Sequence, residues 1–212
     1  MTPMTLPILA ALALALTAQS APMALAQSSS QAAPAPTASA APQPSAAASQ
    51  AIRLVEAARA QIATFALYTP AYVKIPYPGG DVPASTGVCT DVIVRAYRTL
   101  GIDLQVEIKK SGVGSGDTNI DHRRVEVQRK FFSLKGQTLP VTKNAADYKP
   151  GNIVTFHLPN GWFSKTHVAI VSDKLSPNGT PLIIHNRGFG VQEEDWLFAE
   201  KITGHYQYRL TK

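Results

Sequence analysis

The sequence predicts an α+β fold in which helices come first and an antiparallel sheet follows. Apolar residues between positions 51 and 136 recur at helical spacing in three segments. After Pro150-Gly151 the apolar segments become short, strand-like and separated by turn residues. Helices followed by strands are typical of α+β domains rather than of alternating α/β domains.

The first quarter of the chain differs from the rest, because its first charged residue is Arg53. An apolar run over residues 6–17 is too short to span a bilayer comfortably, and it leads to the small-x-small cleavage site Ala24-Leu25-Ala26. We predict a signal peptide over residues 1–26, although Lys and Arg are missing from its first residues. No cysteine follows the run directly, which excludes a lipid-anchored lipoprotein.

Residues 27–50 consist almost entirely of Ala, Pro, Ser and Gln, a composition that predicts a disordered linker. Residues 51–212 then have the size of one domain with its own core. We expect this domain to be periplasmic or secreted, without stable membrane insertion. Oligomeric state is not indicated by the sequence.

All of the formal charge of +6 lies in this domain. A basic exported protein is attracted to an anionic cell wall, a membrane surface or nucleic acid. Solubility explains the net charge equally well. Nucleic acid is not expected, because Arg123-Arg124 is only a short basic pair and no basic run with interleaved aromatic residues is present.

The helical half begins with a predicted helix over residues 51–65. Residues 68–83 contain four prolines and the Gly79-Gly80 pair, which predict a structured loop. A helix that begins at Cys89 and ends near Leu100-Gly101 follows. Thr118 and Asp121 resemble a capping box for another helix that reaches Gly136.

The second half predicts short strands over residues 153–157, 167–173, 182–186 and 206–210. The acidic cluster Glu193-Glu194-Asp195 predicts a helix N-terminus, where carboxylates complement the helix dipole.

Cys89 is the only cysteine, so it cannot form an internal disulfide. Its expected place is a helix N-terminus, where free backbone N–H groups and the helix dipole lower the pKa of a thiol. Those properties suit a nucleophile. A small buried apolar residue is the alternative interpretation.

Two histidines are predicted to face each other beside this thiol. The turn signal Asn178-Gly179 lies between two predicted strands, and a hairpin centred on Ser176 places His167 opposite His185 on one face. Asn186 falls on the other face. A cysteine on a helix, a histidine on a facing sheet and a polar group that orients the imidazole are the three parts of papain-like catalysis. A pair of histidines on a polar sheet face is the alternative.

Four segments resemble the successive motifs of NlpC-type cell-wall peptidases. They are Gly87-Val88-Cys89-Thr90-Asp91-Val92, Lys149-Pro150-Gly151-Asn152-Ile153-Val154, His167-Val168-Ala169-Ile170-Val171 and Ile183-Ile184-His185. The resemblance implies a papain-like fold with Cys89 as the nucleophile, His167 as its base and His185 as the residue that orients the base.

From about residue 50 onward, the chain more closely resembles the bacterial domain-of-unknown-function family 1287. The segments that carry this likeness are Asn119-Ile120-Asp121-His122-Arg123-Arg124 and Ile202-Thr203-Gly204-His205-Tyr206.

The chain departs from the NlpC pattern beside the nucleophile. Val88-Cys89-Thr90-Asp91 replaces the usual Asp-Cys-Ser-Gly, so substrate contacts at Asp91 differ from that pattern. By the resemblance, Tyr77 before Gly79-Gly80 is expected to help bind the oxyanion, with Tyr72 as a substitute. Asn152 replaces the usual Asp and is expected to cap a turn.

The resulting hypothesis is an exported, cofactor-free amide hydrolase that acts on peptidoglycan or its stem peptides. Asp121, His122, Arg123 and Arg124 are expected to open a helix and bind substrate carboxylates, which arginine pairs in bidentate fashion. A solvated helix start explains the same four residues equally well.

Three other functions are alternatives to the hydrolase. One is a cell-wall-binding module without chemistry, and another is a thiol acyltransferase, which differs only in its acceptor. The third is a metal site built from His157, His167 and His185, which is disfavoured because the sequence has no compact ligand spacing such as His-x3-His. No metal is therefore predicted, and His157 and His205 are interpreted as ordinary strand residues.

Overall fold

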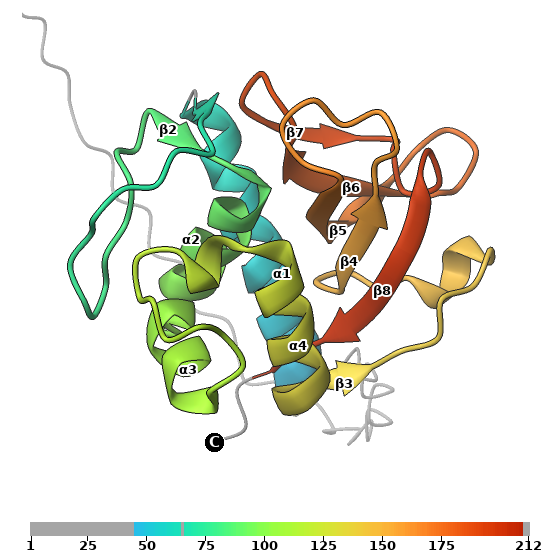
Figure 1. Cartoon of the computed structure of the whole chain (residues 1–212). Coiled ribbons are helices and arrows are strands. Elements are labelled where there is room, and N and C mark those ends of the chain that lie inside the picture. The colour runs from blue at the N-terminus through green and yellow to red at the C-terminus, as the bar shows by residue number, and fades with distance from the viewer. Residues whose placement is uncertain (1–44, 65, 210–212) are drawn as a thin grey trace, which may run out of the picture. The chain divides into compact units, whose positions relative to one another are not determined.

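The computed structural model describes residues 45–64 and 66–209. The predicted signal peptide and most of the predicted linker lie outside these residues. Along the described chain, helices precede most of the sheet, as Figure 1 shows. The α-helices are α1 (Ala46–Arg59), α2 (Cys89–Thr99), α3 (Leu104–Ser111) and α4 (Val125–Lys135). Short 3-10 turns are η1 (Ala60–Ala63), η2 (Asp121–Arg123) and η3 (Ala145–Asp147).

The main sheet has six strands in the order β3-β8-β4-β5-β6-β7, and all neighbours are antiparallel. Its strands are β3 (Gln137–Thr138), β4 (Ile153–His157), β5 (Thr166–Leu175), β6 (Pro181–Asn186), β7 (Val191–Glu194) and β8 (Lys201–Gln207). A separate parallel pair joins β1 (Leu67–Tyr68) to β2 (Thr86–Gly87). The predicted α+β fold is confirmed.

The sheet separates two apolar clusters, because side chains alternate between its faces. Val168 and Ile170 of β5 pack in one cluster with Cys89 and other residues of α1, α2 and α4. Ala169 and Val171 pack in the other cluster, with residues of β4 and β6. The helices therefore cover one face of β5 and bring the start of α2 against that strand (Figure 1).

Helix boundaries differ from the predictions where side chains cap the backbone. Helix α1 begins at Ala46, inside the predicted linker, because the hydroxyl of Ser45 accepts a hydrogen bond from the backbone N–H of Ala48 at 3.2 Å. Helix α3 was not predicted, although Asp103 accepts from the N–H of Gln105 and Gly112 ends the helix with φ of 71°.

The predicted capping box at residues 118–121 is wrong. The carboxylate of Asp121 accepts from the hydroxyl of Ser115 at 2.9 Å and from the N–H of Gly116 at 2.7 Å. These bonds fold the preceding loop instead of opening a long helix. The chain then makes the short turn η2 before α4 begins at Val125.

The predicted helix start at Glu193-Glu194-Asp195 is also wrong, because Glu193 and Glu194 belong to β7, which pairs with β6. Each carboxylate lies beside a cation: Glu193 accepts from Arg59 at 2.8 Å and Glu194 accepts from Arg187 at 3.2 Å. Pairing with cations of the fold, rather than a helix dipole, accounts for the acidic cluster.

The strand register at the two histidines is shifted from the prediction. Ile170 pairs with Ile184, whereas a hairpin centred on Ser176 would pair it with Leu182. The difference arises at the turn, where Leu175 pairs with Pro181 so that the hairpin is centred on Asn178, and the bulge between Val171 and Leu175 then reduces the offset. Because the shift is an even number of residues, His167 and His185 still share a face. Strand β8 ends at Gln207, earlier than the predicted strand over residues 206–210.

Candidate active site

Cys89 is the first residue of α2 and lies at a cavity of about 340 Å³. The parallel pair β1–β2 aligns Tyr68 with Gly87, two residues before Cys89, and so brings the tyrosine to the same cavity. Polar residues of the lining are Tyr68, Tyr72, Thr90, Arg123, Arg124, Glu126, Ser164 and Thr166. The thiol residue itself is only 2% exposed.

Burial raises the pKa of the Cys89 thiol to about 11, and the negative charge of Asp91 adds to the increase. The polar groups near the sulfur act in the opposite direction: the backbone of Val168, the hydroxyl of Tyr68 and the backbone of Thr90. The sequence-based expectation of a lowered pKa is wrong, because loss of solvation outweighs the helix N-terminus. The resting thiol is therefore neutral at pH 7.

His167 and His185 contact each other directly. Nε2 of His167 lies 2.9 Å from Nδ1 of His185, and neither residue is more than 1% exposed. The ring of Trp196 packs against both imidazoles, with centroid distances of 5.8 and 5.3 Å. Burial lowers the pKa of both histidines below the usual range, so both rings are neutral at pH 7.

The thiol lies near the peptide that joins His167 to Val168, because the backbone of Val168 is close enough to lower the pKa of Cys89. Val168 shares the apolar cluster of Cys89. The ring of His167 lies on the alternate face of β5, 6.1 Å from the ring of Phe156. The fold thus places the thiol on one side of the start of β5 and the histidine pair on the other. The two histidines contact each other as predicted, but the predicted position of the pair beside the thiol is wrong, because His167 alternates with Val168 along the strand.

Glu194 extends the histidine pair, and sequence reasoning missed it. Oε1 of Glu194 lies 3.6 Å from Nε2 of His185, and Nη2 of Arg187 donates to Oε2 of Glu194. Contact with His185 and Arg187 lowers the pKa of Glu194 to about 2. The acidic cluster was the available signal, but strand pairing decides which carboxylate faces His185.

Asp91 and Arg123, both predicted to contact substrate, form a buried ion pair. Nε and Nη2 of Arg123 donate to the two carboxylate oxygens of Asp91 at 2.8 and 3.0 Å. Oδ2 of Asp91 also accepts from the N–H of Val88 at 2.7 Å. The pair therefore ties the start of α2 to η2, and its charges are used within the protein.

The other three predicted carboxylate-binding residues have different surroundings. Asp121 is engaged with its loop, as described above, and does not line the thiol cavity. His122 is 2% exposed, its Nδ1 has no partner among the described residues, and burial lowers its pKa to about 4. Arg124 is exposed and lines the cavity, so it is the predicted residue best placed to meet a ligand.

Tyr77 is placed away from the lining of the thiol cavity, whose tyrosines are Tyr68 and Tyr72. Its loop is held elsewhere: the N–H of Gly79 donates to Asp103 at 2.7 Å, and the N–H of Gly80 donates to Gln105 at 3.0 Å. Tyr68 was missed because the two-residue parallel pairing that positions it has no periodic signal in the sequence.

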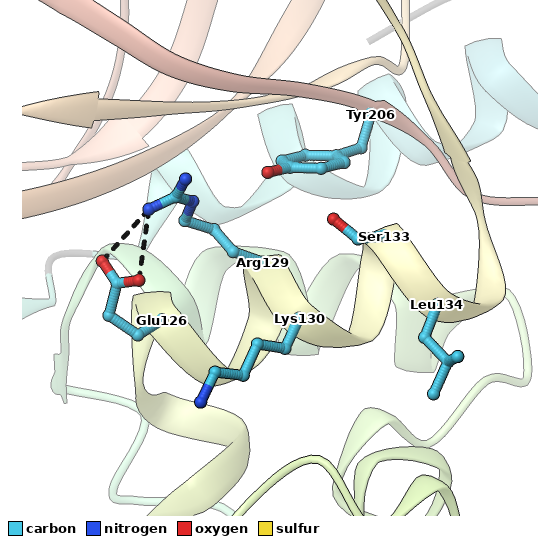
Figure 2. A pocket seen from close by; sticks show the side chains of 6 residues that line it. All are labelled: Glu126, Arg129, Lys130, Ser133, Leu134 and Tyr206. Atoms are coloured by element: carbon cyan, nitrogen blue, oxygen red, sulfur yellow. Dashed lines mark hydrogen bonds and ion pairs between the residues drawn. The ribbon is translucent and has the colours of Figure 1, made fainter.

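A second hollow of about 480 Å³ lies between α4 and Tyr206 (Figure 2). Its Arg129 donates to Glu126 at 3.1 Å and to the carbonyl of Thr203 at 3.0 Å. Glu126 also lines the thiol cavity, but the described lining of this hollow includes none of the predicted catalytic residues.

Within residues 45–64 and 66–209, no group of three or more metal-ligating side chains is arranged to hold a metal ion. His157 is exposed at the end of β4. In the same described part of the chain, no helix combines the length and apolar character needed to cross a membrane.

A family model described as "Domain of unknown function (DUF1287)" matches residues 55–208. The chain belongs to this family. The chain is also similar in sequence to "Uncharacterized protein YijF" of Escherichia coli (strain K12). The two are 43% identical over 173 residues, which cover 76% of this chain and 83% of that protein. The family predicted from the sequence is thus confirmed.

Two solved structures, NlpC2 and NlpC1 from Trichomonas vaginalis, are each 20% identical to this chain. Their TM-scores are 0.47 and 0.46, and the matches cover 75% and 74% of this chain. This DUF1287 chain spans less than half the length of those two proteins, 46% and 44% respectively.

Proposed function

We propose that this protein is an exported, thiol-dependent amide hydrolase that cleaves peptide bonds of peptidoglycan. Cys89 is the nucleophile, His167 is its base and His185 orients the base. The observation that carries the proposal is the contact between His167 and His185, together with the position of Val168, the residue after His167, in the same apolar cluster as Cys89. The motifs shared with NlpC-type peptidases support the same assignment.

The pKa values favour a general-base step over a preformed ion pair. The thiol is neutral, since its pKa is raised to about 11, and His167 is neutral because burial lowers its pKa. The proposal requires the start of β5 to turn so that Nδ1 of His167 reaches the thiol, because the two lie on opposite sides of that strand. As the sulfur attacks the amide carbonyl, its proton then passes to Nδ1 of His167, since Nε2 faces His185. The new imidazolium then donates this proton to the leaving amine, and water hydrolyses the thioester.

Stabilisation of the oxyanion is assigned to the backbone N–H of Cys89 and the hydroxyl of Tyr68. A backbone N–H at a helix start points toward an anion, and Tyr68 already contacts the sulfur from the cavity side. Tyr68 thus takes the role that the resemblance had suggested for Tyr77.

Arg124 supports a substrate that carries carboxylates, as the stem peptides of peptidoglycan do. It is exposed at the cavity beside Thr90 and Tyr72, whereas the neighbouring Arg123 is bound to Asp91. An arginine side chain at that position can pair with a carboxylate in bidentate geometry.

The experiment that tests this function compares the wild-type protein with Cys89→Ala on peptidoglycan and on defined stem peptides, with mass spectrometry of the soluble products. We expect new fragments from the wild type alone, and their masses identify the bond. Cys89→Ser is the matched control, because it keeps the size of the side chain while losing the sulfur. Fragments released equally by Cys89→Ala would contradict the assignment of the nucleophile.

The burial of Cys89 and the position of the histidine pair on the other side of β5 favour a second function, a cell-wall-binding module without chemistry. In that case wild-type protein and Cys89→Ala sediment equally with peptidoglycan, and neither releases fragments. A thiol acyltransferase is distinguished in the same experiment by an added amine, which would appear in the product in place of water.

A further inference from the structure

Two buried polar atoms beside the histidine pair face each other without a hydrogen bond. Among the described residues, Nε2 of His185 and Oε1 of Glu194 are both buried and lack a hydrogen-bond partner. They lie 3.6 Å apart, just beyond hydrogen-bond length. A buried polar atom without a partner is costly, so a small rotation of the Glu194 side chain that closes this gap is favourable for both atoms.

The chemistry of this contact decides where the imidazole protons lie. An ionised carboxylate only accepts hydrogen bonds, so Nε2 of His185 carries the proton that faces Glu194. A neutral imidazole has one N–H, which makes Nδ1 of His185 an acceptor. Because this Nδ1 lies 2.9 Å from Nε2 of His167, the proton between the rings belongs to His167. Nδ1 of His167 is then left with a lone pair.

We propose that Glu194 is a positioning residue that holds both histidines in the Nε2–H tautomer, so that Nδ1 of His167 is the basic nitrogen. The catalytic consequence rests on the function proposed above. Without an acceptor at Glu194, the opposite arrangement becomes available, in which Nδ1 of His185 donates to Nε2 of His167. Nδ1 of His167 then carries a proton and cannot accept one from the thiol.

The surroundings of Glu194 keep it ionised and in place. Arg187 donates to its second oxygen at 3.2 Å, and the guanidinium of Arg187 lies 5.4 Å from the centroid of the Trp196 ring. Trp196 in turn packs against both imidazoles. The carboxylate, the arginine and the tryptophan therefore enclose the outer side of His185.

Glu193 provides a matched control on the same strand. It pairs with Ile184 in the sheet, next to Glu194, and its carboxylate binds Arg59, Lys174 and Ser172 rather than a histidine. Removing either carboxylate deletes one partly buried charge from β7, but only Glu194 faces the histidine pair.

The test is nitrogen NMR of the imidazoles in protein labelled with ¹⁵N-histidine at pH 7, since protonated and unprotonated ring nitrogens have well-separated shifts. We expect Nε2–H at both His167 and His185 in the wild type. Glu194→Leu is expected to populate Nδ1–H at His167, and Glu194→Gln, which keeps an acceptor oxygen, to restore the wild-type form in part. Glu193→Leu is expected to leave both tautomers unchanged.

A wild-type proton on Nδ1 of His185 overturns the inference without any variant, so the test does not depend on whether Glu194→Leu folds. An unchanged tautomer in folded Glu194→Leu overturns it as well. For hydrolysis of a stem peptide, we expect Glu194→Leu to lower kcat about 10- to 100-fold with little change in KM. Expected tautomers in a wild-type protein that releases no fragments would contradict the proposed function alone.

Discussion

Two buried histidine sites lie in the same sheet and differ in what their ring nitrogens contact. His205 on β8 uses both nitrogens within the protein: Nδ1 lies 2.9 Å from the carbonyl of Pro140, and Nε2 lies 2.7 Å from Oδ1 of Asn152. In the other site, His167 and His185 use one nitrogen each on the other ring. That leaves Nδ1 of His167 and Nε2 of His185 for further partners.

The difference separates a structural histidine from a candidate catalytic one. Asn152 also accepts from the N–H of Lys149, and Tyr148 stacks on His205 with a centroid distance of 4.4 Å. His205 therefore bridges a turn and a loop and has no free nitrogen for chemistry. Burial alone does not distinguish the two sites, because His167 and His205 are each 1% exposed.

The largest effect expected from this comparison is on catalysis. Replacing His167 with Gln should lower hydrolysis of a stem peptide about 10²- to 10⁴-fold, the usual contribution of a general base, while His205→Gln should stay close to the wild-type rate. Rates are to be measured on variants whose folding is checked by circular dichroism. A folded His205→Gln protein as inactive as His167→Gln would remove the distinction between the sites.

A third buried histidine extends the comparison to pH. His122 has its pKa lowered to about 4, so the folded state resists the proton that the unfolded state takes up below about pH 6.5. The burial of His122 therefore leaves the free energy of unfolding unchanged above about pH 6.5 and lowers it as the pH falls from about 6.5 to about 4. Urea unfolding from pH 7 to 4 should lose about 3 kcal/mol less stability in His122→Gln than in the wild type. Parallel curves for the two proteins would contradict this.

The smallest effect is on stability at the structural site. His205→Ala removes the partner of two oxygens and should lower the free energy of unfolding by about 1–3 kcal/mol in urea at pH 7. The exposed His157 is the control, and His157→Ala should change stability by less than about 0.5 kcal/mol. Equal stability of the two variants would show that the contacts of His205 are not needed.

The predictions from sequence succeeded where local pattern decides the structure. Strand β4 has the predicted bounds, and α2 begins at Cys89 as expected. The shared face of His167 and His185 was correct even though the register was shifted, because alternation depends only on whether the shift is even or odd.

The predictions failed where the position of a side chain depends on pairing with a segment far away in the sequence. Tyr68 reaches the thiol through pairing with Gly87, and Glu194 reaches His185 through pairing of β7 with β6. Neither pairing has a periodicity that a local window of sequence contains. The acidic cluster was interpreted from its own charge, whereas its partners Arg59 and Arg187 lie elsewhere in the chain.

The sequence by itself determined the fold class, the family and the face that His167 and His185 share, because side-chain periodicity and motifs are local properties. Only the tertiary structure decided the pKa of Cys89, the tyrosine beside it and the carboxylate beside His185. Those properties depend on burial and on contacts between segments far apart in the chain, which the order of residues does not state.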